Sequence, residues 1–385
     1  MFTPRVSSFY SVDDFHHAAR RRLPPFVYDV VAGGASHELA LRRNIKAFND
    51  IVIVPRIGLD TSVITTEVTF FGVKYAAPFG IAPLGLCGLV HPNGDILLAK
   101  AAAKFRIPYV ASTTASISVE KIADACGVAP WFQLYASKSA ELTYQLIDRV
   151  ERLGCPVLIV TVDTAAAGRR LRDLHNGLTL PFHLNARHLV QAASSPIWGI
   201  RRLLAGNVRF PNIEDASQKG KKLPFADLMA MQTGGILDWT VLRQVRQRWS
   251  GIMLLKGVLS PADAVFAESI GVDGLILSNH GGRQLDCAPA PISVLPDIVS
   301  TNLRKKFLAV DSGVRSGGDV VKALVRGADM AFFGRAFLFA LAAGGEKCID
   351  QLINILLEET RNTMALSGIL SADAKSRSNF GDTEK

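Results

Sequence analysis

Short apolar and β-branched runs recur along the chain, and longer stretches with helical spacing of apolar positions lie between them. This alternation is typical of repeated strand–helix units in which each strand is buried on both faces. Several helical stretches begin at Ser, Asp or Gly, which suit a helix N-terminus. The predicted strands are residues 79–83, 107–112, 131–135, 157–163, 252–257, 273–279, 307–312 and 330–334.

Eight such units indicate a parallel sheet closed into an α/β barrel, the (β/α)8 or TIM barrel, preceded by a helical N-terminal segment. An open doubly wound sheet is the alternative. We expect residues 1–385 to form a single domain. In a barrel, functional side chains lie at the C-terminal ends of the strands. The polar residues at or just after those ends are Ser112, Gln133, Tyr135, Asp163, Lys256, His280, Arg283, Asp311, Arg315 and Arg335.

One connection, after the fourth predicted strand, is far longer than a usual loop. This insertion, residues 183–235, has no strand pattern. Its first part, 186–209, mixes Trp198 and several Leu and Ile with arginines. We interpret it either as a basic helix whose Trp and Leu share a membrane-facing side, or as a lid packed on the barrel rim. The polar second part is expected to be mobile.

Composition narrows the class of protein and its partners. The 385 residues are 49% hydrophobic, enough for a large core, and the net charge of +9 favours anionic partners. No basic stripe with interleaved aromatics is present, so we expect no nucleic acid partner. The five cysteines are far apart and the eight histidines have no metal-ligand spacing, which argues for a reducing compartment and against a metal site.

The expected location follows from the termini and the apolar segments. The N-terminus has no apolar signal sequence, and the apolar segment 328–343 is interrupted by Arg335 and too short to span a membrane. We therefore expect a cytoplasmic protein. A peripheral position on the inner face of the cell membrane is the alternative that the insertion adds.

The stretch SNHGGRQLD, residues 278–286, follows a predicted strand and carries an imidazole close to a guanidinium. A neutral imidazole is a suitable base near pH 7, and an arginine grips a carboxylate with two parallel hydrogen bonds. His280 and Arg283 therefore predict a base and a carboxylate clamp. A purely structural histidine is the alternative.

The stretch TVDTAAAGRR, residues 161–170, repeats this theme with a carboxylate and an arginine pair. A carboxylate bonded to an imidazole fixes the ring and stabilises its protonated form. Asp163 is therefore the candidate partner of His280, and Arg170 is a second candidate clamp. The alternative is that Asp163 caps a helix or pairs with Arg169.

Two Gly–Arg pairs follow the last two predicted strands, Gly313 with Arg315 and Gly334 with Arg335. Barrels often bind phosphate at this place through backbone N–H groups and helix N-termini. Neither stretch is a dinucleotide fingerprint after a first strand, so a nicotinamide-binding unit is not supported. Lys256, at the end of another strand, is either a Schiff-base amine or a permanent cation beside a cofactor ring.

Taken together, these motifs resemble the FMN-dependent 2-hydroxy acid oxidase and dehydrogenase family. The resemblance rests on LPPFVYD, WFQLY, TVDT, LLKGV, SNHGGRQLD, DSGVRSGGDVVKAL and GRAF, and it covers about residues 12–367. Within the family, RDLHN, IAPLGLCGLVHPNGD and the long insertion look most like the membrane-associated bacterial (S)-mandelate and L-lactate dehydrogenases.

The resemblance implies FMN as cofactor and a role for each matching residue. His280 is the implied base, Asp163 its partner, and Tyr135, Arg170 and Arg283 the substrate-binding residues. Lys256 is implied to stabilise the anionic reduced ring, which favours the permanent cation. The residues implied to contact FMN, besides Lys256, are Pro83, Gly85, Ser112, Gln133, Thr161, Ser278, Asp311, Gly313, Arg315, Gly334 and Arg335.

Two positions depart from the family pattern. Members usually have a substrate-binding tyrosine directly after V-Y-D, where this chain has Val30. Loss of a hydroxyl bonded to a charged carboxylate weakens binding by about 1.5–3 kcal/mol unless another group substitutes. Thr114 stands where glycolate oxidases tend to have a bulky aromatic residue. We therefore expect a roomier pocket that takes an aryl or longer-chain 2-hydroxy acid.

The predicted reaction is oxidation of an (S)-2-hydroxy acid, mandelate- or lactate-like, to the 2-oxo acid. His280 takes either the C2 proton or the hydroxyl proton, and both routes stay open. Electrons pass from FMN to a quinone or another acceptor, or to O2 in an oxidase. The alternatives are a Schiff-base aldolase and a non-catalytic flavin-binding protein. The family resemblance also implies a homo-oligomer, a tetramer.

Overall fold

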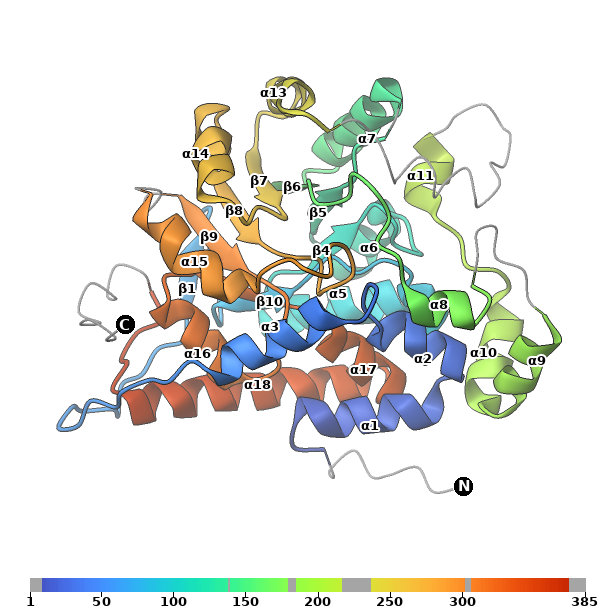
Figure 1. Cartoon of the computed structure of the whole chain (residues 1–385), viewed down its shortest axis with the longest axis horizontal. Helices are drawn as coiled ribbons and strands as arrows, with labels where there is room; N and C mark the ends of the chain where they lie inside the picture. The colour runs from blue at the N-terminus through green and yellow to red at the C-terminus, as the bar shows by residue number, and fades with distance from the viewer. Residues whose placement is uncertain (1–8, 138, 179–184, 217–236, 302–305, 374–385) are drawn as a thin grey trace.

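The computed structural model describes residues 9–137, 139–178, 185–216, 237–301 and 306–373. Its centre is an eight-stranded parallel sheet in the order β3-β10-β9-β8-β7-β6-β5-β4, and a bridge between Ile81 and Tyr109 joins the two outer strands. The predicted barrel is therefore confirmed, and the open doubly wound sheet is wrong (Figure 1). The strands are β3 (Phe79–Ile81), β4 (Val110–Ser112), β5 (Trp131–Leu134), β6 (Val157–Thr161), β7 (Ile252–Lys256), β8 (Gly274–Leu277), β9 (Phe307–Val310) and β10 (Met330–Phe333).

Each of these strands coincides with one predicted apolar run. From β3 to β10 nearly every strand residue is buried, as expected for a sheet covered by helices on its outer side. The predicted runs were too long at their C-terminal ends. Asp163 and Asn279, for example, already lie in the loops after β6 and β8. This places the polar side chains on loops at the sheet's C-terminal edge.

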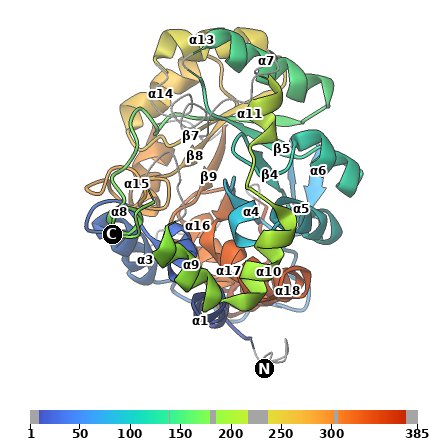
Figure 2. The same ribbon diagram turned by 90° about the vertical axis from the view of Figure 1, so that its right-hand side faces the viewer.

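The helices cover the outside of the barrel and one end of it (Figures 1 and 2). Helix α1 packs against α17, and α18 packs against α16, α17 and α5. The described helices that surround the barrel are α4 (Cys87–Val90), α5 (Gly94–Phe105), α6 (Val119–Cys126), α7 (Ala140–Arg152), α8 (Leu171–His175), α13 (Trp239–Arg248), α14 (Pro261–Ser269), α15 (Pro291–Ser300), α16 (Gly317–Val325), α17 (Arg335–Gly344) and α18 (Glu346–Ser367).

The predicted N-terminal helical segment consists of α1 (Val12–Arg22), α2 (Pro25–Ala32) and α3 (Leu39–Asn49). A hairpin that the sequence analysis missed follows it, formed by β1 (Val68–Phe70) and β2 (Val73–Tyr75). Its Val68 and Tyr75 join a core cluster with Trp131, the first residue of β5, and the Trp131 indole donates to the Tyr75 hydroxyl at 3.2 Å. The hairpin thus covers the N-terminal end of the barrel, opposite the predicted site.

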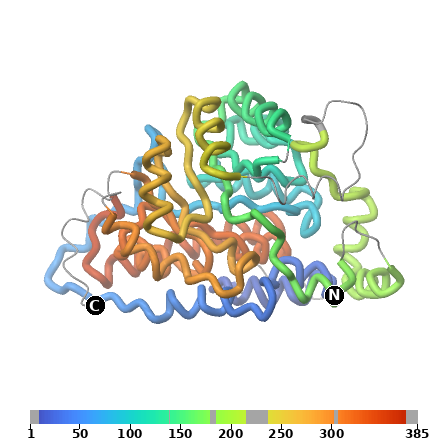
Figure 3. The backbone as a smooth tube through the Cα atoms, turned by 45° about the horizontal axis from the view of Figure 1, so that its top comes forward, coloured from blue at the N-terminus to red at the C-terminus, as the bar shows by residue number. Residues whose placement is uncertain are grey.

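The described part of the insertion forms three short helices rather than one basic helix. They are α9 (Ala186–Ala193), α10 (Pro196–Ala205) and α11 (Pro211–Ala216), and they follow one another along one side of the molecule (Figure 3). Ser194 and Ser195 separate α9 from α10, because Pro196 lacks the N–H that a continuous helix would need. The predicted mobile second part lies largely outside the described residues.

The predicted orientation of the insertion was wrong for its tryptophan. The Trp198 indole turns inward, packs against the core and donates to the Leu89 carbonyl at 2.7 Å. Leu203 and Leu204, in contrast, are each 83% exposed. Trp and Leu therefore do not share a side. Among the described residues, no helix is long and apolar enough to cross a membrane.

Candidate active site

The strand C-termini surround a cavity of about 1010 Å³. The predicted site residues that line it are Pro83, Gly85, Tyr135, Thr161, Arg170, Lys256, His280, Arg283, Asp311, Gly313, Arg315, Gly334 and Arg335. The other four, Ser112, Gln133, Asp163 and Ser278, lie behind this lining and hydrogen-bond to it through Thr114, Thr161, His280 and Lys256 respectively. The structure therefore brings all seventeen residues to one end of the barrel.

His280 has a backbone conformation that residues other than glycine rarely adopt. Its φ of 60° lies in the left-handed region, and the neighbouring Ser312 has a φ of 71°. Two hydroxyls hold the turn: Ser278 Oγ accepts from the His280 N–H at 3.0 Å, and Ser312 Oγ accepts from the Gly281 N–H at 2.9 Å. Such strain persists only where the surroundings over-determine it, which is common at functional sites.

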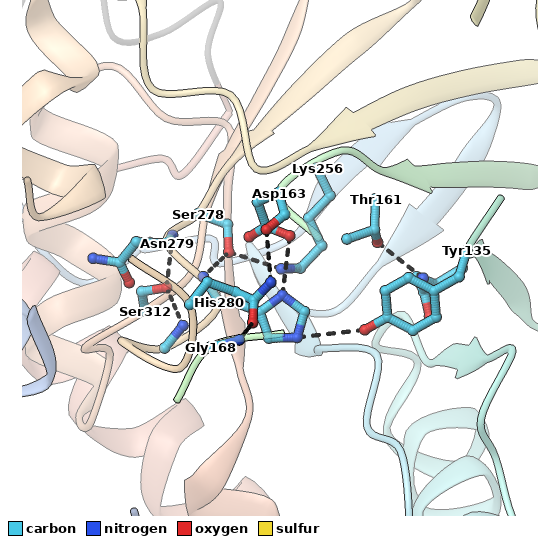
Figure 4. A network of polar contacts seen from close by, with 12 residues as sticks. Tyr135, Thr161, Asp163, Gly168, Lys256, Ser278, Asn279, His280 and Ser312 are labelled. Carbon is cyan, nitrogen blue, oxygen red and sulfur yellow. Dashed lines mark hydrogen bonds and ion pairs between the residues drawn. The ribbon is translucent and has the colours of Figure 1, made fainter. Parts of the chain in front are cut away.

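The imidazole of His280 lies between a carboxylate and a phenol (Figure 4). Its Nδ1 is 3.0 Å from Asp163 Oδ1, and its Nε2 is 3.4 Å from the Tyr135 hydroxyl. Because an ionised carboxylate only accepts, Nδ1 donates to Asp163, and in the neutral ring Nε2 is the acceptor that faces the Tyr135 hydroxyl. The ring is thus set to accept a proton on the side that faces the cavity.

Two pKa shifts support this arrangement. Burial raises the pKa of Asp163, but His280 and Lys256 outweigh it and hold that pKa below its ordinary value. Burial and the nearby Asp163 charge raise the pKa of Tyr135 well above its ordinary range. At neutral pH, Asp163 is therefore an anion and Tyr135 a neutral hydrogen-bond donor.

Lys256 is a buried cation with two partners. Its side chain is only 6% exposed, Nζ donates to Ser278 Oγ at 2.7 Å, and Nζ lies 3.1 Å from Asp311 Oδ2. The ammonium thus forms a buried ion pair with the Asp311 carboxylate. The arrangement favours the permanent cation over the Schiff-base amine, which must be neutral to react.

Next to Lys256, which pairs with Thr161 across β6 and β7, four polar side chains form a continuous chain. Thr114 bonds to Ser112, Ser112 donates to Gln133, and Gln133 donates to Thr161, over distances of 2.9–3.0 Å. Gly85 lies against this chain, and an added Cβ there would come within 2.3 Å of Thr114 Oγ1. Of the four residues, Thr114 and Thr161 line the cavity, so their hydroxyl groups are available to a polar ligand.

The predicted anion site has an open helix N-terminus. Helix α17 begins at Arg335, and its N-cap Gly334 makes no side-chain cap bond, so the N–H groups of the first turn face the cavity end without a capping side chain. The Arg335 guanidinium, however, donates to the carbonyls of Val31, Gly33 and Gly281. The role of Arg335 as an anion ligand stays a prediction.

Arg170 and Arg283, the two arginines predicted to bind the substrate carboxylate, lie near each other. Their positive charges repel each other unless negative groups lie close by. Burial, followed by the nearby Arg170 charge, lowers the pKa of Arg283 to about 10. Arg283 Nη1 donates to the carbonyls of Val30 and Gly33 at the end of α2, and Arg170 Nε pairs with Asp173 at 2.8 Å. The carbonyls at the C-terminal end of a helix carry partial negative charge, which stabilises a buried arginine.

Four polar residues that the sequence analysis missed support the catalytic loops. Asn44 and Asn279 exchange amide hydrogen bonds, each buried and donating to the other. Asp173 orients Arg170, and Gln284 bonds to the loop that carries Asp163. Asn279 and Gln284 lie within SNHGGRQLD, so the motif contained the signal, but their partners are distant in sequence.

Comparison with known proteins identifies the family. The family model described as FMN-dependent dehydrogenase matches residues 19–381, nearly the whole chain. The chain belongs to this family. Its cofactor is FMN.

Relatives and solved structures agree with this assignment of the FMN-dependent dehydrogenase family. L-lactate dehydrogenase from Caulobacter vibrioides is 39% identical over 361 residues, covering 93% of this chain and 94% of the relative. The crystal structure of the monotopic membrane protein (S)-mandelate dehydrogenase superposes with a TM-score of 0.90 at 36% identity, covering 95% of this chain and 97% of the other. Mandelate oxidase gives a TM-score of 0.82 at 35% identity, covering 96% and 97%.

The residues present fit FMN on structural grounds. The Thr114–Thr161 chain supplies donors and acceptors for a polar ring, and buried Lys256 supplies a positive charge beside it. The uncapped N-terminus of α17 suits a phosphate. A ring, a linker and a phosphate can therefore each be held by a different part of one continuous cavity.

Proposed function

We propose that the protein oxidises an (S)-2-hydroxy acid to the corresponding 2-oxo acid, with His280 as the base. The observation that carries the proposal is the orientation of the His280 ring, fixed by Asp163, in a cavity shared with two arginines. The names of the similar proteins, L-lactate dehydrogenase and (S)-mandelate dehydrogenase, support the substrate class. FMN, when bound, takes up the two electrons of this oxidation.

In this proposal, Arg283 and Arg170 bind the substrate carboxylate. An anion between the two arginines offsets their mutual repulsion and the free-energy cost of burying their charges. A fixed carboxylate leaves C2 and its hydroxyl near His280 Nε2 and the Tyr135 hydroxyl. Binding in this way fixes the position of the substrate before the reaction, so that the loss of its translational and rotational freedom adds less to the activation barrier.

Nε2 of His280 then accepts the proton that leaves the substrate, from C2 or from the hydroxyl. Asp163 stabilises the protonated ring, because the negative charge lies 3.0 Å from Nδ1. Tyr135 stays protonated and donates to the substrate oxygen. Lys256 is the residue that would supply positive charge to the bound FMN ring.

The substrate side chain is expected to be larger than a methyl group. Val30 lines the cavity where the family tyrosine is usual, and Thr114 is small. Phe26, Leu86 and Leu89 line the same cavity and give it an apolar section. Arg283 and Arg170 are left to bind the carboxylate without a tyrosine, so apolar contact with an aryl or longer side chain supplies part of the affinity.

For the electron acceptor, we propose a quinone at a membrane surface, with the protein peripheral on its cytoplasmic face. The exposed Ile200 and Leu204 of α10, together with Arg201, form an apolar and basic surface that suits an anionic membrane interface. The similarity to a monotopic membrane enzyme supports this placement. The implied tetramer stays a prediction.

An anaerobic absorbance titration tests the proposed reaction. Purified protein is expected to show the bound FMN spectrum, and (S)-mandelate or a longer-chain (S)-2-hydroxy acid is expected to bleach it faster than L-lactate or glycolate. A protein that binds FMN but is bleached by none of these acids would contradict the proposal. Bleaching by the (R)-enantiomers alone would contradict the stereochemistry.

A further inference from the structure

The loop that carries Asp163 and Arg170 follows β6, whereas the loop that carries His280 and Arg283 follows β8. In the sheet, β7 lies between these two strands, so no ladder of hydrogen bonds joins β6 to β8. Strand β7 fixes the two strands relative to each other, but beyond the strand ends the position of the base and its carboxylate partner also depends on contacts between the loops. This raises the question of which side chain makes those contacts.

One side chain of the β8 loop bonds three times to the backbone of the β6 loop. Gln284 Nε2 donates to the carbonyls of Asp163 at 2.8 Å and Ala166 at 2.9 Å. Gln284 Oε1 accepts from the Gly168 N–H at 3.0 Å. The amide thus uses both of its donors and its oxygen on one six-residue segment that begins at Asp163.

The orientation of this amide is determined by its partners. The reverse orientation would place the amide oxygen against two carbonyls and the NH2 group against an N–H, so it would lose all three hydrogen bonds. The side chain is only partly exposed, which strengthens these bonds relative to bonds made in water. Gln284 therefore places its NH2 group against two carbonyls and its oxygen against an N–H, and a side chain that replaces it must do the same.

The two loops also lie so close together that no residue larger than glycine fits at their point of contact. A Cβ added at Gly168 would lie 2.0 Å from the Arg283 carbonyl oxygen, so only glycine fits there. Further along, the Ser36 N–H donates to the Arg169 carbonyl at 2.7 Å and the Ala35 N–H donates to the Gly282 carbonyl at 2.8 Å. The N-terminal segment thus fastens the far end of the loop, and Gln284 fastens its start and middle.

We propose that Gln284 is a positioning residue that holds the Asp163 carboxylate against His280 and fixes the path of the loop to Arg170. It acts through the backbone of residues 163–168. This inference rests on the proposed 2-hydroxy acid chemistry, because His280 and Asp163 matter as a pair only if a proton is transferred there.

The test is anaerobic rapid mixing of three holoproteins, wild type, Gln284→Ala and Gln284→Glu, with the acid that reduces wild type fastest. Misplacement of a catalytic group by about 1 Å costs on the order of a hundredfold in rate. We expect both variants to keep full FMN content and full bleaching amplitude, with a limiting rate constant about ten to a hundred times lower.

Gln284→Glu separates hydrogen bonding from volume. The carboxylate has the same shape and still accepts from Gly168, but it places oxygen against the carbonyls of Asp163 and Ala166. We expect it to be at least as slow as Gln284→Ala. Gln244→Ala serves as the matched control, because Gln244 lies on the exposed side of α13 and accepts a hydrogen bond from the Tyr144 hydroxyl. It is expected to react like wild type.

Three outcomes would overturn the inference. The first is a wild-type rate constant in Gln284→Ala. The second is a wild-type rate constant in Gln284→Glu, which would show that only volume matters. The third is a lower bleaching amplitude with an unchanged rate constant, which would mean partial unfolding. Failure of the proposed function has a different signature, since wild type itself would then not be bleached.

Discussion

The catalytic rim and the insertion are held to the same barrel in opposite ways. At the rim, which comprises the loops after β6 and β8, polar side chains hydrogen-bond to the backbone of the loops, as Ser278, Ser312 and Gln284 do. The insertion, α9 to α11, has a few buried polar anchors and leaves apolar side chains outside. His188, fully buried, bonds to the Asn176 carbonyl, and Asn212, also fully buried, donates to the Ser112 carbonyl.

This difference indicates what each region faces. A network of satisfied buried bonds fixes side chains within the small tolerance that catalysis needs. Apolar side chains left in water, such as Leu204 at 83% exposure, are unfavourable unless something covers them. The rim therefore holds a fixed geometry, and we propose that the insertion contacts an apolar surface.

The largest effect is expected from disturbing the rim at the carboxylate. In Asp163→Asn, the new amide can donate to His280 Nδ1, so the ring holds its proton on Nε2 and cannot accept another. By analogy with catalytic triads, the rate constant for flavin reduction should fall about a thousandfold or more. Rapid mixing of the FMN-loaded variant measures it. Asp148→Asn, at a surface ion pair with Arg248, should have no such effect.

A smaller loss is expected when the carboxylate clamp changes shape. Arg283→Lys keeps the charge but cannot make two parallel bonds to a carboxylate or reach both carbonyls of α2. Lost charged hydrogen bonds of about 1.5–3 kcal/mol correspond to a fall in kcat/KM of about 10- to 100-fold. Steady-state kinetics check this result. A kcat/KM within twofold of wild type would show that Arg283 does not bind the substrate.

Buried charge away from the rim is expected to affect stability instead of catalysis. Burial raises the pKa of Asp95 to about 7, and a hydrogen bond from the Ser116 N–H only partly opposes it. Between the unfolded value of 3.8 and about 7, the folded state keeps a proton that the unfolded state has lost. Stability therefore falls as pH rises through this range and then levels off.

Asp95→Asn removes this dependence. Relative to wild type, the variant should gain about 2 kcal/mol in free energy of unfolding between pH 5 and pH 8. Urea denaturation at both pH values measures the gain. Asp124→Asn, at an exposed position of α6, should show none. An equal difference between Asp95→Asn and wild type at both pH values would refute the raised pKa.

The smallest effect on catalysis, and the most specific for the insertion, is expected at its outer surface. The double change Ile200→Ser with Leu204→Ser should lower binding to phosphatidylglycerol-containing liposomes about tenfold or more, because two apolar side chains no longer enter the interface. Flotation measures bound protein. Val52→Ser with Val54→Ser is the matched control, since these residues are 77% and 74% exposed outside the insertion. An equal loss of liposome binding in both pairs would contradict the assignment of the outer surface of α10 as the membrane contact.

The sequence predicted the barrel because its strands are continuous apolar runs, a signal that needs no tertiary information. It also placed the site residues, because the C-terminal ends of parallel strands meet at one edge. The hairpin β1–β2 was missed, since its short strands are partly exposed and form no continuous apolar run. Short strands of this kind are stabilised by their contact with Trp131.

Side-chain direction was the part that the sequence could not provide. Trp198 and Leu204 are both apolar residues in one basic segment, but the tryptophan turns inward, where it donates to the Leu89 carbonyl and packs against Phe26. The Arg335 guanidinium likewise bonds to carbonyls of α2, which is distant in sequence. Gln284 carried no charge to attract notice, although its three partners lie in one loop.

The most direct test of the account is the rate of flavin reduction in His280→Gln. Glutamine keeps polarity and approximate size but has no group that accepts a proton near pH 7. The account predicts that FMN remains bound and that substrate bleaches it at least a thousand times more slowly than in wild type, within the range that a general base contributes together with its orienting partner. Bleaching at a rate near that of wild type would contradict the assignment of His280 as the base.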